Sequence, residues 1–223
     1  MKSYRPERWR SRGAGLLAAI GVSLAGCSSD QSNDYGQVFS IFTHIFGGED
    51  DRVTFQQAAG IPFSTIGVRV GDSTEGILIL GSSNGDRLLW TAASHIVLVT
   101  ANGRVVRTAG LESNLSDMRL VRGSVSGPFP SAETAWEADL PEQHLYSVPV
   151  TCKAYSGGPD TYNNFNSPVP VIRIIDQCRS DQIDWSFTNT YWIAPQTGLM
   201  WHSIQYISPK LDPLELRILR PPG

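Results

Sequence analysis

The sequence lacks features that mark several common classes of protein. It has no internal repeat, no heptad pattern and no low-complexity tract, which excludes solenoids and coiled coils. Its uncharged run from Gly13 to Gly26 is shorter than the about 20 residues that cross a bilayer as a helix. Only 17% of the residues are charged and 41% are hydrophobic, so the composition is globular and not that of a disordered chain.

The four histidines are scattered and show no metal-binding spacing. No pair forms the H-x-x-x-H pattern among His44, His95, His144 and His202. His202 shares one face of a predicted strand with Ile204 and Tyr206, which is typical of a sheet-face or core histidine. We therefore predict no metal and no cofactor.

The motifs that suggest catalysis have simpler explanations. Gly81–Gly85 fits G-x-S-x-G, but a nucleophile elbow joins a strand to a helix, whereas Asn-Gly here predicts a turn between two strands. The acidic groups Glu49-Asp50-Asp51 and Asp181 with Asp184 fall in turn-like segments. We assign no catalytic residue and predict that the protein is not an enzyme.

The first 26 residues have the organisation of a bacterial export signal. A basic start is followed by the uncharged run and by small residues; the basic residues are Lys2, Arg5, Arg8, Arg10 and Arg12. The run ends in Leu24-Ala25-Gly26-Cys27, which resembles the lipobox of bacterial lipoproteins, in which the cysteine thiol is acylated and the signal is cleaved just before it. We predict removal of residues 1–26 and lipidation of Cys27. The alternatives are an ordinary signal peptide with a chance cysteine, or a buried helix.

Lipidation would decide where the protein resides. One myristoyl chain binds a membrane only reversibly, whereas the three acyl chains usual on bacterial lipoproteins, palmitate among them, anchor a protein permanently. Ser28 stands where an inner-membrane retention signal typically has Asp, so we predict an outer-membrane anchor with the protein facing the periplasm. Residues 27–34 are predicted to be a polar tether, and residues 35–223 a single β-rich domain.

The net charge changes when the predicted signal is removed. The whole chain has 18 basic and 21 acidic residues, for a net charge of −3. Residues 1–26 contain five basic residues and the acidic Glu7, which leaves 13 basic and 20 acidic residues and a net charge of −7. An acidic surface argues against nucleic acid and against nonspecific binding to polyanions. It is compatible with a neutral sugar or a basic protein partner.

The rest of the chain predicts one short helix followed by many strands. Apolar residues recur at helical spacing between Tyr35 and Phe46. This segment lacks the flanking Lys and Arg of a helix that lies on a membrane, which favours packing against the domain. Strands are predicted at 64–70, 77–80, 88–92, 96–100, 104–108, 145–155, 169–178, 183–193, 199–207 and 214–219.

The connections between these strands indicate the fold class. Asn84-Gly85 and Asn102-Gly103 predict tight hairpins, Ser131–Ala138 is predicted to start a helix, and the stretch between 155 and 169 is predicted to be a polar loop. The fold class is therefore mainly β: a single antiparallel, strongly curved sheet or half-barrel with one or two short helices.

Two cysteines remain after the predicted lipidation. Cys152 and Cys178 fall on predicted neighbouring antiparallel strands, and the predicted compartment is oxidising. We predict a disulfide between them. The alternative is two buried free thiols.

Aromatic residues gather in the last third of the chain. Trp185, Phe187 and Tyr191 share one side of a predicted strand, Trp192 takes the other side, and Trp201 stands on the next strand. Aromatic side chains on a sheet face can stack on sugar rings or line an acyl-chain cavity, although they more often belong to the core. The candidate binding residues are Trp185, Tyr191, Trp192 and Trp201.

Several stretches resemble one family of bacterial proteins. They are Gly60–Thr65, Thr100–Val106, Gly110–Leu115, Thr190–Ile193 with Thr197-Gly198, and Leu216–Pro221. Their order and spacing are similar to those of the YjbF/GfcB lipoproteins, from about residue 58 to the end, and the lipobox agrees with them. The resemblance transfers a functional role to one residue only, the lipidated Cys27.

The resemblance implies an outer-membrane lipoprotein associated with exopolysaccharide or group 4 capsule. We expect a non-enzymatic accessory factor that binds or scaffolds during polysaccharide secretion or assembly, with periplasmic and outer-membrane secretion proteins, and the polysaccharide itself, as candidate partners. The first alternative is a half-barrel that carries lipid or lipoprotein in an apolar cavity. The second is an enzyme that acts on glycans, which predicts two convergent carboxylates in a cleft.

Overall fold

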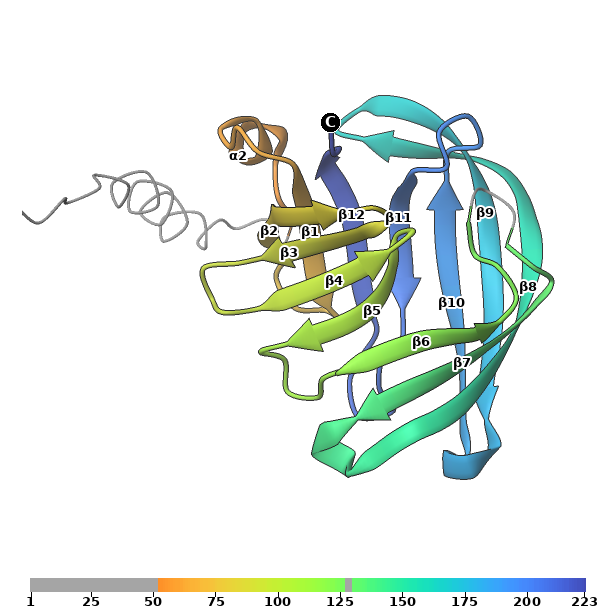
Figure 1. The fold of residues 1–223 in the computed structure, drawn as a ribbon. Helices are drawn as coiled ribbons and strands as arrows, with labels where there is room; N and C mark the ends of the chain where they lie inside the picture. The colour runs from red at the N-terminus through yellow and green to blue at the C-terminus, as the bar shows by residue number, and fades with distance from the viewer. Residues whose placement is uncertain (1–51, 127–129) are drawn as a thin grey trace, which may run out of the picture.

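The computed structural model describes residues 52–126 and 130–223, which form one antiparallel sheet of 12 strands. The strand order is β5-β4-β3-β2-β1-β12-β11-β10-β9-β8-β7-β6, so neighbours in the sheet are neighbours in the chain except where the first strand pairs with the last (Figure 1). The predicted fold class, a single curved antiparallel sheet, is confirmed.

The strands differ widely in length. They are β1 (Thr65–Val70), β2 (Gly76–Asn84), β3 (Arg87–Thr91), β4 (Val97–Ala101), β5 (Arg104–Ala109), β6 (Asp117–Arg122), β7 (Glu133–Leu140), β8 (Leu145–Asn164), β9 (Ser167–Ser180), β10 (Trp185–Ile193), β11 (Met200–Gln205) and β12 (Leu214–Arg220). Two short 3₁₀ turns, η1 (Pro141–Gln143) and η2 (Asp181–Ile183), precede β8 and β10.

The sheet curls until its two edge strands approach each other, so that it is nearly closed into a barrel (Figure 1). The backbone N–H of Thr108 on β5 donates to the carbonyl of Leu115, just before β6, at 2.7 Å. Register shifts interrupt seven of the strand pairs, including β2–β3, β4–β5 and β10–β11. Such bulges increase the local twist and bend a sheet, which accounts for the strong curvature.

Both hairpins predicted from Asn-Gly are present. Gly85 joins β2 to β3 with φ +62°, and Asn102 and Gly103 join β4 to β5 with φ +48° and +78°. Positive φ at both central residues is the geometry of a type I′ turn, which suits the twist of two paired strands. A side chain at Gly103 would also overlap Met200, so this turn needs glycine for two reasons.

The main core fills the inside of the curved sheet. Side chains alternate between the inside and the outer face along β7, β9 and β10, as the two-residue period of a strand requires. The largest fully buried side chain is Trp90, and Trp136, Trp185 and Phe187 are in the same core cluster. A smaller cluster around Ile77 and Leu219 lies on the outer face.

The helix α2 (Phe55–Ala59) covers that outer cluster and was not predicted. Thr54 and Gln57 form a capping box at its start, which satisfies backbone donors that have no partner within the helix. α2 is the one α-helix of the described residues, which agrees with one or two short helices. The helix predicted at Tyr35–Phe46, the signal, Cys27 and the tether lie outside the described residues.

Two predictions about the middle of the chain were wrong. Residues 133–140 form β7 and not a helix, because Thr134, Trp136, Ala138 and Leu140 are all buried at a period of two. The predicted loop between 155 and 169 is instead the distal half of a long β8–β9 hairpin, closed by Phe165 and Asn166. Its glycine and proline content favoured a loop, but Gly158 with φ +86° occupies a bulge within the strand.

The distal half of the β8–β9 hairpin reaches the end of the sheet where α2 and the C-terminus lie (Figure 1). The ring of Phe165 lies 5.7 Å from that of Phe55 on α2, edge to face. The guanidinium of Arg217 on β12 lies 5.2 Å from the Phe165 ring. The hairpin therefore covers part of the outer face of the sheet.

Candidate functional site

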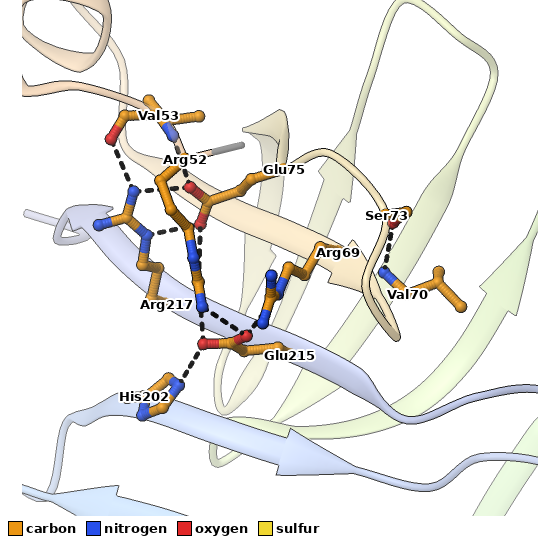
Figure 2. A network of polar contacts seen from close by, with 9 residues as sticks. All are labelled: Arg52, Val53, Arg69, Val70, Ser73, Glu75, His202, Glu215 and Arg217. Atoms are coloured by element: carbon orange, nitrogen blue, oxygen red, sulfur yellow. Dashed lines mark hydrogen bonds and ion pairs between the residues drawn. The ribbon is translucent and has the colours of Figure 1, made fainter. Parts of the chain in front are cut away.

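A network of charged side chains lies on the outer face of β1, β11 and β12 (Figure 2). Arg217 donates from Nε and Nη2 to the two carboxylate oxygens of Glu75, at 2.5 and 2.6 Å. Glu215 accepts from both Nη atoms of Arg52, at 2.9 and 3.0 Å, and from Nε of Arg69 at 2.6 Å. With a histidine of β11, these residues form the outer network: Arg52, Arg69, Glu75, His202, Glu215 and Arg217.

Strand register brings these groups together. On β12 the side chains of Leu214, Leu216 and Ile218 point inward, so Glu215 and Arg217 point outward. Arg69 on β1 pairs directly with Glu215, and Gly67 pairs with Arg217. A side chain at Gly67 would overlap the carboxylate of Glu75, so this glycine makes room for the network.

Aromatic rings enclose His202, whose Nε2 lies 2.8 Å from the carboxylate of Glu215. The ring of Trp192 stacks on it with centroids 4.4 Å apart, and the ring of Tyr162 stacks at 5.3 Å. The indole N–H of Trp192 donates to Asp160 at 3.0 Å. Trp192 and His202 are therefore part of the packing between the β8–β9 hairpin and the sheet.

The two carboxylates of the network are close together but both are paired. Nη1 of Arg52 lies 2.9 Å from Glu215 and 4.0 Å from Glu75. Burial acts to raise the pKa of Glu215, but hydrogen bonds from His202, Arg52 and Arg69 outweigh it and keep that pKa well below its usual range. A glycoside hydrolase needs one carboxyl group that stays protonated to act as the acid. Glu215 does not meet this requirement.

The network also fixes the first described residues to the sheet. Glu75 accepts from the backbone N–H of Val53 at 2.7 Å, and Arg217 donates to the carbonyl of Val53 at 2.7 Å. The outer network is therefore a structural connection between the segment that enters the domain and its last strand.

A second polar cluster is buried inside the sheet. Nη2 of Arg104 on β5 lies 3.3 Å from Asp176 on β9, and both side chains are buried. The guanidinium lies 4.3 Å above the ring of Tyr191. The side chain of Gln205 accepts from the N–H of Val105 and donates to a carbonyl of the β4–β5 turn, at 2.9 and 3.1 Å. This interior cluster joins the edge strand β5 to the opposite wall.

The interior cluster has little room for chemistry. Burial raises the pKa of Asp176 despite the neighbouring Arg104, and burial raises the pKa of Tyr191 to about 12. Nε of Arg104 and Oδ1 of Asp176 are buried without a hydrogen-bond partner. The adjoining void has a volume of about 20 Å³, which is enough for about one water molecule. A raised carboxyl pKa without space for a substrate does not make a catalytic site.

A larger cavity opens at one mouth of the curved sheet, with a volume of about 280 Å³. Its inner part is apolar, and Trp90, Met200 and Trp201 are among its lining residues. Three connections meet at its rim: the β2–β3 turn, the β4–β5 turn and the β10–β11 loop. We call this space the mouth cavity. The rest of the inside is packed with the core described above.

The structure separates the four candidate aromatic residues. Trp185 and Tyr191 are buried inside the sheet, with 9% and 2% of their surface exposed. Trp192 lies on the outer face in the stack with His202. Trp201 is partly exposed and lines the mouth cavity. The four residues do not form one surface: Trp201 lines the mouth cavity, and Trp185 lines a separate pocket together with Tyr206 and Ser208.

The two cysteines of the domain are joined by a disulfide in the structure. Cys152 and Cys178 are directly opposite each other on β8 and β9, and their Cα atoms are 4.0 Å apart. Both side chains belong to the main core. Lipidation of Cys27 remains a prediction, since that residue is outside the described range.

Within 52–126 and 130–223, no three His, Cys, Asp or Glu side chains are grouped so that they could bind a metal ion. The helices of the same residues include none with the length and apolar character needed to cross a membrane.

Comparison with known proteins gives a family that fits these observations. Residues 40–219 match the family model described as "Group 4 capsule polysaccharide lipoprotein gfcB, YjbF". The chain belongs to the YjbF family. The resemblance found in the sequence is thus confirmed, and the family accounts for nearly the whole sheet.

Relatives in Escherichia coli K12 match over almost their full length. The chain is 25% identical to "Uncharacterized lipoprotein GfcB", covering 92% of this chain and 97% of the relative. It is 21% identical to "Uncharacterized lipoprotein YjbF", covering 92% and 96%. The crystal structure of the hypothetical lipoprotein YmcC from the same bacterium matches with a TM-score of 0.65 and 22% identity, over 87% of this chain and 99% of that one. This last likeness supports the fold.

Several of the segments that carry the family resemblance line the mouth cavity. Thr100–Val106, Thr197-Gly198 and Leu216–Pro221, which carry the YjbF resemblance, all supply lining residues. The outer network and the interior cluster, in contrast, were not predicted. One available indication was Asp176, which occupies an inward position between Ile174 and Cys178 on an otherwise apolar face.

Proposed function

We propose that this protein is a lipid-anchored, non-enzymatic accessory factor of exopolysaccharide or capsule export. It is attached to the outer membrane through Cys27 and faces the periplasm, where it binds or scaffolds components of polysaccharide secretion. The observation that carries this proposal is the match of residues 40–219 to a family described by a group 4 capsule polysaccharide lipoprotein. The lipobox at Leu24–Cys27 supports the anchor.

The geometry of the charged groups supports a role without catalysis. In the outer network, guanidinium groups pair with both carboxylates. Asp176 is enclosed beside a void of about 20 Å³. Neither arrangement leaves a free carboxyl group facing a cleft, which the glycan-hydrolase alternative requires.

The lipid-carrier alternative has less support from the interior. Cavities for drug-sized ligands measure about 300–1,000 Å³, and the mouth cavity of about 280 Å³ is just below that range. The main core and the interior cluster fill most of the remaining inside. The space suits one small group better than a whole acyl chain.

A clean deletion tests the proposal in the producing bacterium. We expect a change in the amount, chain length or surface retention of its polysaccharide, restored by the wild-type gene. The variant Cys27→Ser should not restore it, because the protein would no longer be retained at the membrane. Labelled palmitate should enter the wild-type protein and not this variant. Unchanged polysaccharide in the deletion strain would overturn the proposed function.

A further inference from the structure

We propose that the mouth cavity is a sugar-binding site that accepts one pyranose ring of a polysaccharide. This inference deepens the proposed function, on which it rests, by naming the ligand class and the residues that contact it. The size of the cavity and the chemistry of its wall and of its rim support this assignment.

The size of the cavity limits the ligand to one small ring. Its volume of about 280 Å³ is at the lower limit for ligand pockets. Rigid neighbours set that limit: Met200 packs against Gly103, where even a Cβ atom would overlap it. Trp90 is almost fully buried behind the cavity, and its indole N–H donates to Thr100 at 3.0 Å. The wall therefore has a fixed shape.

The wall offers an aromatic surface for the ring's C–H groups. Trp201 is partly exposed and lines the cavity from β11, together with Leu88, Ile66 and Leu216 from the sheet. The polar atoms deeper in the cavity already have partners, since the hydroxyl of Ser203 accepts from Gln205 at 2.8 Å. The inner part is thus suited to the apolar face of a sugar, which stacks on indole rings.

The rim offers hydrogen-bonding groups for the ring's hydroxyls. Asn102 of the β4–β5 turn donates to the carboxylate of Asp86 in the β2–β3 turn at 3.0 Å, which places an amide and a carboxylate side by side. Thr197 also lines the cavity, from the β10–β11 loop. An apolar wall with a few convergent polar groups is the usual composition of a small-ligand site. The rim pair matches a sugar better than an apolar side chain of a protein.

The mouth is also open to a longer molecule. Asp86 and Gly85 are exposed, so a ring bound in the cavity can remain linked to the rest of a polysaccharide outside. The overall negative charge of the mature chain is compatible with a neutral sugar. We therefore infer a neutral pyranose as the preferred residue.

The test uses the full lipidated protein in detergent micelles with ¹⁵N-labelled tryptophan. The probes are the methyl glycosides of glucose, galactose, N-acetylglucosamine and glucuronic acid, and oligosaccharides released from the surface polysaccharide of the producing bacterium. We expect saturable shifts of the Trp201 indole signal with at least one neutral probe. Trp201→Ala should weaken binding about tenfold or more, as for a central aromatic contact, and Trp201→Phe should retain part of it.

Trp192→Ala provides the matched control, because it removes the same side chain from the outer face of the adjacent strand. It should leave the affinity unchanged. In the same way, Asp86→Ala should weaken binding, whereas Asp160→Ala, which removes the partner of Trp192, should not. Folding of each variant is checked from its other tryptophan signals.

Three results would overturn the inference: no saturable shift with any sugar, equal losses in Trp201→Ala and Trp192→Ala, or binding of a small apolar alcohol such as hexanol in place of sugar. The last result would assign the cavity to an apolar side chain of a partner protein. None of these results changes the polysaccharide of the deletion strain, so failure of the sugar site is distinguishable from failure of the proposed function.

Discussion

The outer network and the interior cluster are built from the same residue types on opposite faces of one sheet. In the outer network, two carboxylates receive several charge-assisted hydrogen bonds, and the side chain of Glu215 stays 14% exposed. In the interior cluster, a single guanidinium meets a single carboxylate, and one polar atom of each is left without a partner. The pKa of Glu215 is accordingly lowered, whereas that of Asp176 is raised. Burial and the number of hydrogen-bond partners decide whether the pKa of a carboxyl group is raised or lowered, because removal from water penalises the charged form unless hydrogen bonds replace the water.

The largest expected effect comes from removing one partner of the interior pair. Arg104→Ala leaves Asp176 buried without its cation, and we expect a loss of about 3–5 kcal/mol in the free energy of unfolding. The double variant Arg104→Met/Asp176→Leu removes both charges and should be close to wild type or more stable. Urea unfolding followed by tryptophan fluorescence measures both. A double variant as unstable as the single one would show that the pair itself stabilises the fold.

The disulfide beside the interior cluster should have the next largest effect. Cys152 lines the same void as Arg104, and the bond joins residues 26 apart in the chain. Replacing both cysteines with alanine should cost about 3 kcal/mol, because it releases a constraint on the unfolded chain. Mass spectrometry with and without reductant checks the bond in the exported protein. Two free thiols in that sample would contradict the structure. In that case, adding reductant would not change the free energy of unfolding.

Acid should affect the two clusters in opposite directions. The native pKa of Glu215 is below its unfolded value of about 4.3, so its stabilising contribution is complete above that pH and is lost as the pH falls towards the native pKa. The native pKa of Asp176 is above its unfolded value of about 3.9, so the native state gains stability relative to the unfolded state as the pH falls through that native pKa.

Paired variants make this difference measurable. Glu215→Gln should cost about 1–3 kcal/mol at pH 7, and this cost should shrink as the pH is lowered below about 4.3. The stability difference between wild type and Asp176→Asn should instead grow as the pH is lowered through the raised pKa of Asp176. Unfolding free energies at half-unit pH steps test both trends. Parallel pH curves for the two variants would show that their environments do not differ as described.

The smallest effect is expected for an exposed ion pair on the same sheet. Nζ of Lys153 lies 3.7 Å from Glu133, and both side chains are more than half exposed. Lys153→Ala should change the free energy of unfolding by less than about 0.5 kcal/mol. This variant gives the baseline for the others, and a larger loss would mean that the outer face contributes more through its charges than the geometry indicates.

Local sequence features predicted much of the fold. Asn-Gly turns located two hairpins, and alternation located most strands, because both depend on residues adjacent in the chain. Residues 133–140 were misassigned although their alternation is regular, and the distal β8–β9 hairpin was taken for a loop because of its glycine and proline content. In both places the pairing with neighbouring strands determines the structure, and pairing is not visible locally.

The candidate sites were harder to predict for the same reason. The outer network needs the first strand beside the last, since Glu75 and Arg217 are 142 residues apart. The mouth cavity needs three connections from different parts of the chain to meet. Alternation on β11 places Trp201 on the inside with Ser203 and Gln205, but only the register shift between β10 and β11 explains why Met200 also faces the inside, opposite Ile193.

The pairing of β1 with β12 has a consequence for biogenesis. Until the final residues are available, β1 and β11 each present an unpaired edge, and the core cannot be completed. Contacts of such long sequence separation form late, and open strand edges favour aggregation. A chain that stopped before Leu214 would therefore expose two strand edges to proteases, so that folding of the sheet requires the complete chain.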